Sequence, residues 1–258
     1  MADGNNKPLA PGDPVVLRIR RQAGPDSPPY WEEFEVQYAA GMNVLSALMA
    51  VAAKPVTRTG QATSPVAYDA SCLEEVCGSC TMVINGFVRQ ACSTLVDGLP
   101  QPIVLEPMSK FPTLRDLVVD RSEMFLMLQR IKAFVPIDGT FALGAGPRIS
   151  EKVRQRGYEF SRCMTCGCCL EACPQYNRRS HFIGAASIGQ VFLFNSHPTG
   201  AELKEDRLEV LAGPGGIAEC GNAQNCQKVC PKDIPLLDAI AQLGRQTTAY
   251  ALRRFLER

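Results

Sequence analysis

Alternating apolar and polar residues near the N-terminus predict two neighbouring strands. Val15–Arg20 and Trp31–Tyr38 are both rich in β-favouring residues, and the intervening segment 21–29 contains the glycine and prolines of a turn. From Asn43 to Ala53 the apolar spacing becomes helical, with Asn43 as a capping residue and Pro55 as a stop. The apolar stripe of this predicted helix consists of Val44, Leu45, Leu48 and Val51.

A hairpin and a further strand follow. Residues 81–84 and 87–92 are β-favouring and flank Asn85-Gly86, a strong signal for a type I′ turn. Residues 103–106 predict another strand. The order of these elements indicates an α+β N-terminal half.

The pattern turns helical after about residue 110. We expect a helix over Phe111–Val135, an apolar helix around 188–194, a helix that opens at Pro198 and continues through Leu211, and a last helix that opens at Pro235. No strand hairpin is expected after residue 150. The predicted domains are therefore 1–120, with 1–13 as a flexible tail, and an all-helical 121–258.

Composition narrows the class of protein. The chain has 258 residues, 46% hydrophobic content and a net charge of +1, which favours folded domains and gives no reason to expect nucleic acid as a partner. The N-terminus lacks the pattern of a secretory signal, and no apolar stretch approaches the roughly 18 residues that span a bilayer. We therefore expect a cytoplasmic protein that reaches a membrane only through a partner.

Twelve cysteines provide the candidate chemistry. They fall in three tight clusters separated by long cysteine-free stretches, whereas disulfide-rich secreted proteins are small and carry export signals. Thiolates clustered in a reducing compartment indicate bound metal. His181 and His197 are interpreted as ordinary polar or packed residues, and none of the residues is predicted to be catalytic.

The first cysteine cluster matches the plant-type [2Fe–2S] pattern, in which four thiolates serve two irons. Gly78 lies between two of the ligands, where a residue without Cβ lets the backbone wrap a cluster. Structural zinc is the alternative, although the C-x4-C-x2-C spacing favours iron and sulfide. The predicted ligands are Cys72, Cys77, Cys80 and Cys92.

Two further runs repeat each other. The first, from Cys163 to Pro174, has the C-x2-C-x2-C-x3-C-P spacing of bacterial ferredoxins, and the second, from Cys220 to Pro231, has Ala223 where its second cysteine would stand. Gly167 and Gly221 are expected to give each loop the same freedom as Gly78.

In two-cluster ferredoxins the fourth cysteine of each run binds the other cluster. This rule predicts a [4Fe–4S] site held by Cys163, Cys166, Cys169 and Cys230, and a [3Fe–4S] site held by Cys173, Cys220 and Cys226. The second site lacks one iron because Ala223 offers no ligating atom. Cys168 is out of register; we interpret it as a packed thiol, and the other interpretation is that it serves as an alternative ligand.

The order of these three motifs resembles the iron–sulfur subunits of succinate dehydrogenase and fumarate reductase. Ser71–Cys80, Phe111–Arg121 and Cys163–Pro174 carry the resemblance, which extends from about Val15 to the C-terminus and is closest to the bacterial branch with menaquinone and a dihaem cytochrome b anchor. It implies a plant-type ferredoxin-like (β-grasp) domain joined to a helical bacterial-ferredoxin-like domain.

The resemblance also implies function and partners. A flavoprotein subunit with FAD would oxidise succinate, this chain would relay the electrons, and a cytochrome b anchor with haem b would present quinone at the cytoplasmic face of the plasma membrane. A quinol:fumarate reductase is the alternative within this class, and a zinc-holding interaction protein is the alternative outside it.

One departure from the ubiquinone branch stands out. Asn177, Arg178 and Gly221 occupy the places where that branch has tryptophans and a histidine of the quinone pocket. Quinone is therefore expected to bind mainly in the anchor, with Pro174 as a candidate neighbour from this chain.

Overall fold

The computed structural model describes residues 9–136 and 148–257. The chain divides into two compact units, Met1–Arg121 and Ser122–Arg258. Of the predicted tail, residues 1–8 lie outside the described residues. In the remainder of that segment, Gly12 donates a hydrogen bond from its backbone N–H to the carbonyl of Tyr38.

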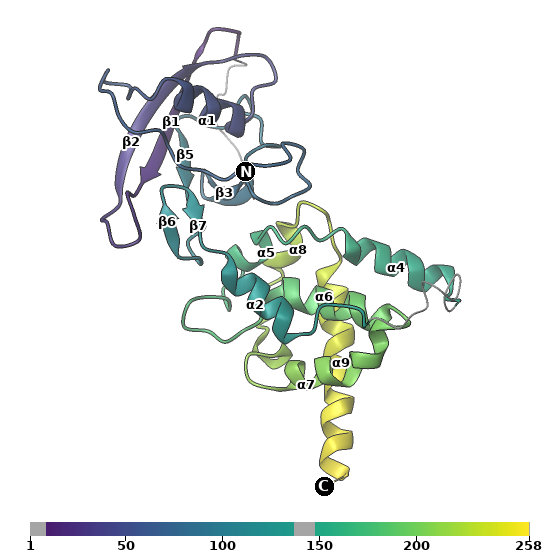
Figure 1. Ribbon diagram of the computed structural model, residues 1–258. Coiled ribbons are helices and arrows are strands. Elements are labelled where there is room, and N and C mark those ends of the chain that lie inside the picture. Colours follow the sequence, from purple (N-terminus) through teal and green to yellow (C-terminus); the bar gives the residue numbers. More distant parts are fainter. Residues whose placement is uncertain (1–8, 137–147, 258) are drawn as a thin grey trace. The chain divides into compact units, whose positions relative to one another are not determined.

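A five-stranded mixed sheet organises the first unit (Figure 1). Its order is β2-β1-β5-β3-β4; β1 and β5 are parallel, and the other neighbours are antiparallel. The strands are β1 (Pro14–Arg21), β2 (Tyr30–Gln37), β3 (Thr81–Ile84), β4 (Phe87–Gln90) and β5 (Ile103–Glu106). The predicted strands and hairpin are therefore confirmed, and Asn85 and Gly86 both have the positive φ of a type I′ turn.

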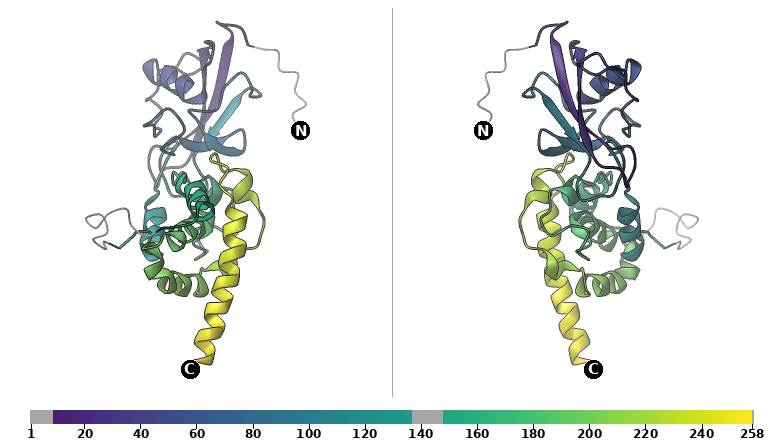
Figure 2. Two further views of the ribbon diagram at one scale, coloured as in Figure 1. Left: turned by 90° about the vertical axis from the view of Figure 1, so that its right-hand side faces the viewer. Right: turned by 90° about the vertical axis from the view of Figure 1, so that its left-hand side faces the viewer.

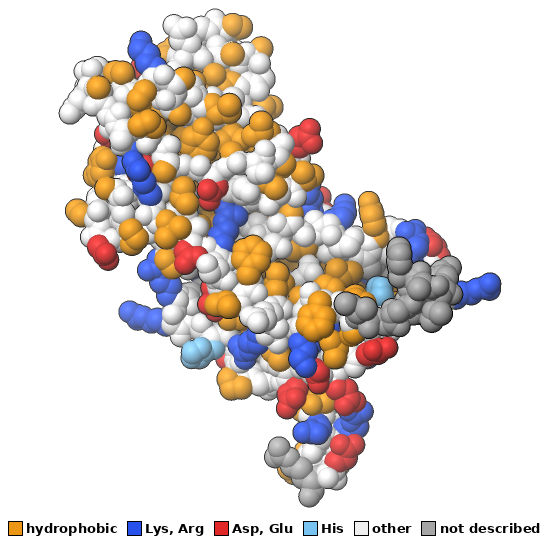
Figure 3. All heavy atoms as spheres, in the orientation of Figure 1, with side chains coloured by type: hydrophobic (Ala, Val, Ile, Leu, Met, Phe, Trp, Pro, Cys, Tyr) orange, Lys and Arg blue, Asp and Glu red, His pale blue; other side chains and the backbone are white. Residues whose placement is uncertain are grey.

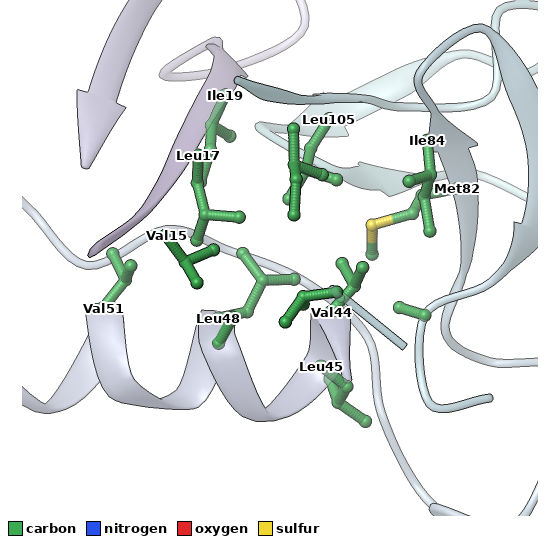
Figure 4. Close-up of a cluster of buried hydrophobic side chains, with 14 of the residues drawn as sticks. Val15, Leu17, Ile19, Val44, Leu45, Leu48, Val51, Met82, Ile84 and Leu105 are labelled. Carbon is green, nitrogen blue, oxygen red and sulfur yellow. The ribbon is translucent and has the colours of Figure 1, made fainter. Parts of the chain in front are cut away.

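Helix α1 (Val44–Ala53) covers one face of this sheet. Asn43 caps the helix as predicted. Its side chain accepts a hydrogen bond from the Ser46 N–H at 2.8 Å, and the Ser46 hydroxyl in turn accepts one from the Asn43 backbone N–H. All four residues of the predicted stripe are buried. Figure 4 shows them facing apolar side chains of β1, β3 and β5: Val15, Leu17, Ile19, Met82, Ile84 and Leu105.

The helix predicted over Phe111–Val135 is wrong in its first half. Residues there form a short hairpin, β6 (Thr113–Arg115) and β7 (Val118–Val119), and helix α2 spans only Ser122–Arg130. The turn is made by Asp116, whose φ is 45° and whose buried carboxylate accepts hydrogen bonds from Arg21 Nε, Gln22 N and Ala67 N. These distant donors stabilise a turn that local spacing does not reveal.

The second unit is helical in its described residues. The long helix α9 (Leu236–Leu256) packs against α6 (Gly184–Ser196) and α7 (Lys204–Ala212). Helix α4 (Glu151–Ser161) packs on α6. Two short helices, α5 (Cys168–Glu171) and α8 (Asn225–Lys228), contact each other, and two 3₁₀ turns span Gly200–Leu203 and Ile217–Glu219. The predicted helix after Pro198 begins as the first of these turns, and the last helix follows Pro235 as expected.

Helix α9 extends past the other helices of its unit (Figure 2). Its final turns carry exposed Leu252, Phe255 and Leu256, with exposed fractions of 59%, 76% and 81%. Charged side chains gather around the same turns (Figure 3), where Arg253 pairs with Glu205 and Glu257. None of the helices in the described residues has both the length and the hydropathy needed to cross a membrane.

Candidate iron–sulfur centres

The loop that carries the first three cysteines lies between α1 and β3 and is irregular. Positive φ values at Leu73, Glu75 and Gly78 let it coil tightly. Its backbone turns N–H groups toward sulfur: Glu74 and Val76 donate to Cys72 Sγ at 3.4 and 3.3 Å, and Ser79 donates to Cys77 Sγ at 3.5 Å. This is the arrangement that stabilises a thiolate.

Two pairs of cysteines in this region influence each other's ionisation. Hydrogen bonding from Ser79, together with a backbone hydrogen bond involving Cys72, lowers the pKa of Cys77 to about 6. Burial raises the pKa of Cys80 to about 11, and Cys92 adds to the rise through its side chain and its charge. The structure thus brings Cys72 beside Cys77 and Cys80 beside Cys92, and the ligation of two irons by these four thiols stays a prediction.

The second group of cysteines lines a hollow in the helical unit. Its wall contains Cys163, Cys166, Cys169 and Cys230, the four predicted together. Burial, followed by the charges of the other three, raises the pKa of Cys169 well above its ordinary value. Buried thiolates of like charge need cationic compensation, which the irons of a cluster supply.

Cys168 also lines this hollow and is fully buried at the start of α5. Its role as a packed thiol stays a prediction.

The third group lines a neighbouring hollow. Cys173, Cys220 and Cys226 surround it together with Ala223. Burial raises the pKa of Cys226, and the charges of Cys173 and Cys220 raise it further. Pro174 and Gly221 also lie in this wall.

The two runs repeat each other in backbone conformation. Thr165 and Asn222 both have a φ of 52°, while Gly167 and Gln224 follow two residues later with φ of 88° and 63°. The prediction for Gly221 is therefore wrong: Gln224, which accepts the strain of a left-handed residue, corresponds to Gly167. By the same register Ala223 corresponds to Cys166.

Gly221 instead lies against a neighbouring side chain. A Cβ at this position would lie 2.6 Å from the side-chain Nε2 of Gln175. A larger side chain at this position would need Gln175 to move.

The cysteines ring these hollows without converging on a point. None of the twelve, all of which lie in the described ranges, forms a disulfide bond. Within residues 9–136 and 148–257, no three His, Cys, Asp or Glu side chains come close enough to hold a single metal ion. Cysteine sulfurs line each hollow and no carboxylate among the described residues does, which fits the soft thiolate ligation of iron–sulfur clusters.

The five-stranded sheet, the helical second unit and the grouped cysteines together define a class of protein. It is a two-domain iron–sulfur protein of the electron-transfer class. Residues 16–126 match the family model of a "2Fe-2S iron-sulfur cluster binding domain", and residues 159–234 match that of a "4Fe-4S dicluster domain". The predicted α+β fold class is confirmed by these matches.

Known relatives specify the family. The chain is 57% identical to the succinate dehydrogenase iron–sulfur subunit of Bacillus subtilis over 92% of its own length and 94% of the relative's. It is 31% identical to the fumarate reductase iron–sulfur subunit of Wolinella succinogenes, covering 85% of this chain and 90% of that one. The chain belongs to the family of succinate dehydrogenase and fumarate reductase iron–sulfur subunits, and it is an electron-transfer subunit of the succinate dehydrogenase type.

A solved structure agrees in fold. A chain of the Mycobacterium smegmatis Sdh1 complex in the apo form superposes with a TM-score of 0.74 at 23% identity, covering 93% of this chain and 97% of that chain.

Proposed function

We propose that this chain relays electrons through one [2Fe–2S], one [4Fe–4S] and one [3Fe–4S] cluster, from the FAD of a flavoprotein partner to quinone at a membrane anchor. Each cluster, when bound, accepts and donates one electron at a time. The chain's own residues hold the clusters, exclude water from them and tune their potentials through charge and hydrogen bonding.

Eleven cysteines are proposed as ligands. Cys72, Cys77, Cys80 and Cys92 would hold [2Fe–2S]; Cys163, Cys166, Cys169 and Cys230 would hold [4Fe–4S]; Cys173, Cys220 and Cys226 would hold [3Fe–4S]. The grouping of the last seven of these thiols around two separate hollows supports their assignment, and the proximity of Cys72 to Cys77 and of Cys80 to Cys92 supports the first. It also supports the exchange of Cys173 and Cys230 between the runs, since each lines the hollow of the opposite run.

The proposal depends most on the position of Ala223. This residue lines the second hollow and has the backbone register of Cys166 in the first. A site with three thiolates instead of four lacks the ligand for its fourth iron. Cluster type and net charge both set the reduction potential, and a high potential suits the last carrier before quinone.

The partners follow from the family. A flavoprotein with FAD would supply electrons, and a cytochrome b anchor with haem b would bind menaquinone and hold the chain at the cytoplasmic face of the plasma membrane. The exposed Leu252, Phe255 and Leu256 at the end of α9 support a protein partner at that helix, since three large apolar side chains stay in solvent without one.

Fumarate reduction is the second candidate function. The 31% identity with the fumarate reductase subunit of Wolinella succinogenes favours it. Assaying the purified complex with succinate and a dye, and then with reduced quinone and fumarate, separates the two directions.

A substitution tests the cluster assignment. In the purified complex, Ala223→Cys should convert the [3Fe–4S] site to [4Fe–4S], abolish the electron paramagnetic resonance signal of the oxidised [3Fe–4S] cluster and slow electron delivery to quinone. Ala218→Cys, which adds an exposed thiol two residues before Cys220, serves as the control. An unchanged [3Fe–4S] signal in Ala223→Cys would show that the register is wrong, and zinc without acid-labile sulfide in the wild-type protein would exclude the clusters altogether.

A further inference from the structure

Arg121 binds the backbone of the first cysteine loop. Its Nη1 donates to the carbonyl of Gly78 and its Nη2 to the carbonyl of Ser79, each at 2.6 Å. The guanidinium is a planar fork, so it fixes two successive carbonyls at once. Arg121 follows β7 and is separated from this loop by more than 40 positions in the sequence.

The first of these hydrogen bonds determines where a neighbouring N–H group points. In a trans peptide the carbonyl of one residue and the N–H of the next point in opposite directions. With the Gly78 carbonyl held by Arg121, the N–H of Ser79 faces away from the guanidinium and donates to Cys77 Sγ at 3.5 Å. Arg121 therefore orients the donor that reaches a proposed cluster ligand.

Thr81 supports the same peptide. Its hydroxyl donates to the Gly78 carbonyl at 2.7 Å, so this buried oxygen accepts from two groups. The loop needs such support because Gly78 has a φ of 74° and has no side chain of its own to anchor it.

The charge of Arg121 is not matched by a carboxylate in the part of the chain that the structure describes, where its hydrogen bonds go to carbonyls. Its Nε is buried and has no hydrogen-bond partner there. A positive charge held beside a redox centre favours the reduced state, which carries one more electron.

We propose that Arg121 is a positioning residue for the [2Fe–2S] site, which fixes the Gly78–Ser79 peptide against Cys77 and raises the reduction potential of that site. The proposal rests on the cluster ligands proposed above. It concerns a residue that binds no iron and acts through the loop and through its charge.

Redox-titrated electron paramagnetic resonance of the whole purified complex tests this role. We expect Arg121→Gln to lower the ratio of reduced to oxidised [2Fe–2S] about tenfold at a fixed ambient potential, which is about 59 mV for a one-electron couple. Arg121→Lys keeps the charge but loses the fork, so its midpoint should shift less while its signal broadens. The other two clusters provide the internal reference.

Arg18→Gln is the matched control. Arg18 lies on β1 over the Trp31 ring, 4.8 Å from its centroid, and its loss changes the net charge by the same amount. A midpoint and line shape in Arg121→Gln equal to those of Arg18→Gln would overturn the proposal. If Arg121→Gln fails to assemble the cluster, Arg121→Lys decides, because an unaltered signal in that variant refutes the positioning role.

These outcomes are distinct from failure of the proposed function. That failure would appear as the absence of a [2Fe–2S] signal in the wild-type complex. The signal in wild type and its change in Arg121 variants are therefore separate results.

Discussion

The buried carboxylate of Asp116 should be among the most sensitive positions of the first unit. Only 2% of its side chain is exposed, and it accepts from Arg21 Nε at 3.0 Å, Gln22 N at 2.9 Å and Ala67 N at 2.8 Å. Asp116→Asn preserves shape but replaces one oxygen with an NH₂ group. With Oδ1 kept toward Arg21, the new donor meets the Ala67 N–H and leaves that N–H unsatisfied.

The cost can be estimated from these contacts. A buried orphan donor costs about 1–3 kcal/mol, and a hydrogen bond to a charged group contributes about 1.5–3 kcal/mol. Glu32 still pairs with Arg21, which keeps the loss below the roughly 5 kcal/mol of a completely broken buried pair. We therefore expect Asp116→Asn to lower the free energy of unfolding of this unit by about 3 kcal/mol.

Urea unfolding followed by tryptophan fluorescence measures this effect. Trp31 is the only tryptophan in the chain and lies in β2, so its signal reports on the first unit alone. The control is Glu106→Gln, which removes an ion pair with Arg20 at 3.9 Å whose side chains are 33% and 36% exposed, and should cost less than about 1 kcal/mol. If the two variants unfold at the same urea concentration, the hydrogen-bond argument for Asp116 is wrong.

Two further predictions use the same unit. Asn43→Ala removes the capping bond to Ser46 N and the 2.9 Å bond from Asn43 Nδ2 to the Cys92 carbonyl, and should lower the free energy of unfolding by about 1 kcal/mol in the same urea assay; no shift of the midpoint would contradict the capping role. In iron-free protein, the thiolate is the form that an alkylating reagent attacks, and it predominates above the pKa. With a pKa of about 6, Cys77 should be modified already at pH 7, whereas Cys80, with a pKa of about 11, should react only in strong alkali. Mass spectrometry of alkylated peptides checks this order, and Cys80 labelled first at pH 7 would refute it.

Local chemistry explains what could be predicted from the sequence. The cap at Asn43 and the turn at Asn85-Gly86 depend on residues a few positions apart, and both are confirmed. The cysteine motifs are equally local, because each is recognised by the spacing within one short run, and the exchange of Cys173 and Cys230 follows from the known two-cluster pattern. The grouping of thiols around the hollows was therefore accessible from the sequence.

Three features could not be predicted from local spacing, namely the hairpin at residues 113–119, helix α4 and the role of Arg121. The hairpin at residues 113–119 depends on Arg21, which lies 95 positions before Asp116. Helix α4 was missed because its apolar stripe is weak, with only Phe160 buried, although Ser150 and Glu151 were available as N-terminal signals. Arg121 was missed because an arginine that binds carbonyls leaves no pattern in its own neighbourhood.

The exchange of Cys173 and Cys230 between the two runs has a consequence for assembly. On the proposed ligand set, α5 and α8 cannot each mature alone, because each run completes the other's site, and Asn225 Nδ2 already ties them by a 3.0 Å bond to the Ala172 carbonyl. Cofactor insertion and folding of the second unit are then one cooperative event. Loss of residues 220–230 would remove ligands from both sites, so a partly translated chain would hold neither cluster in its finished form.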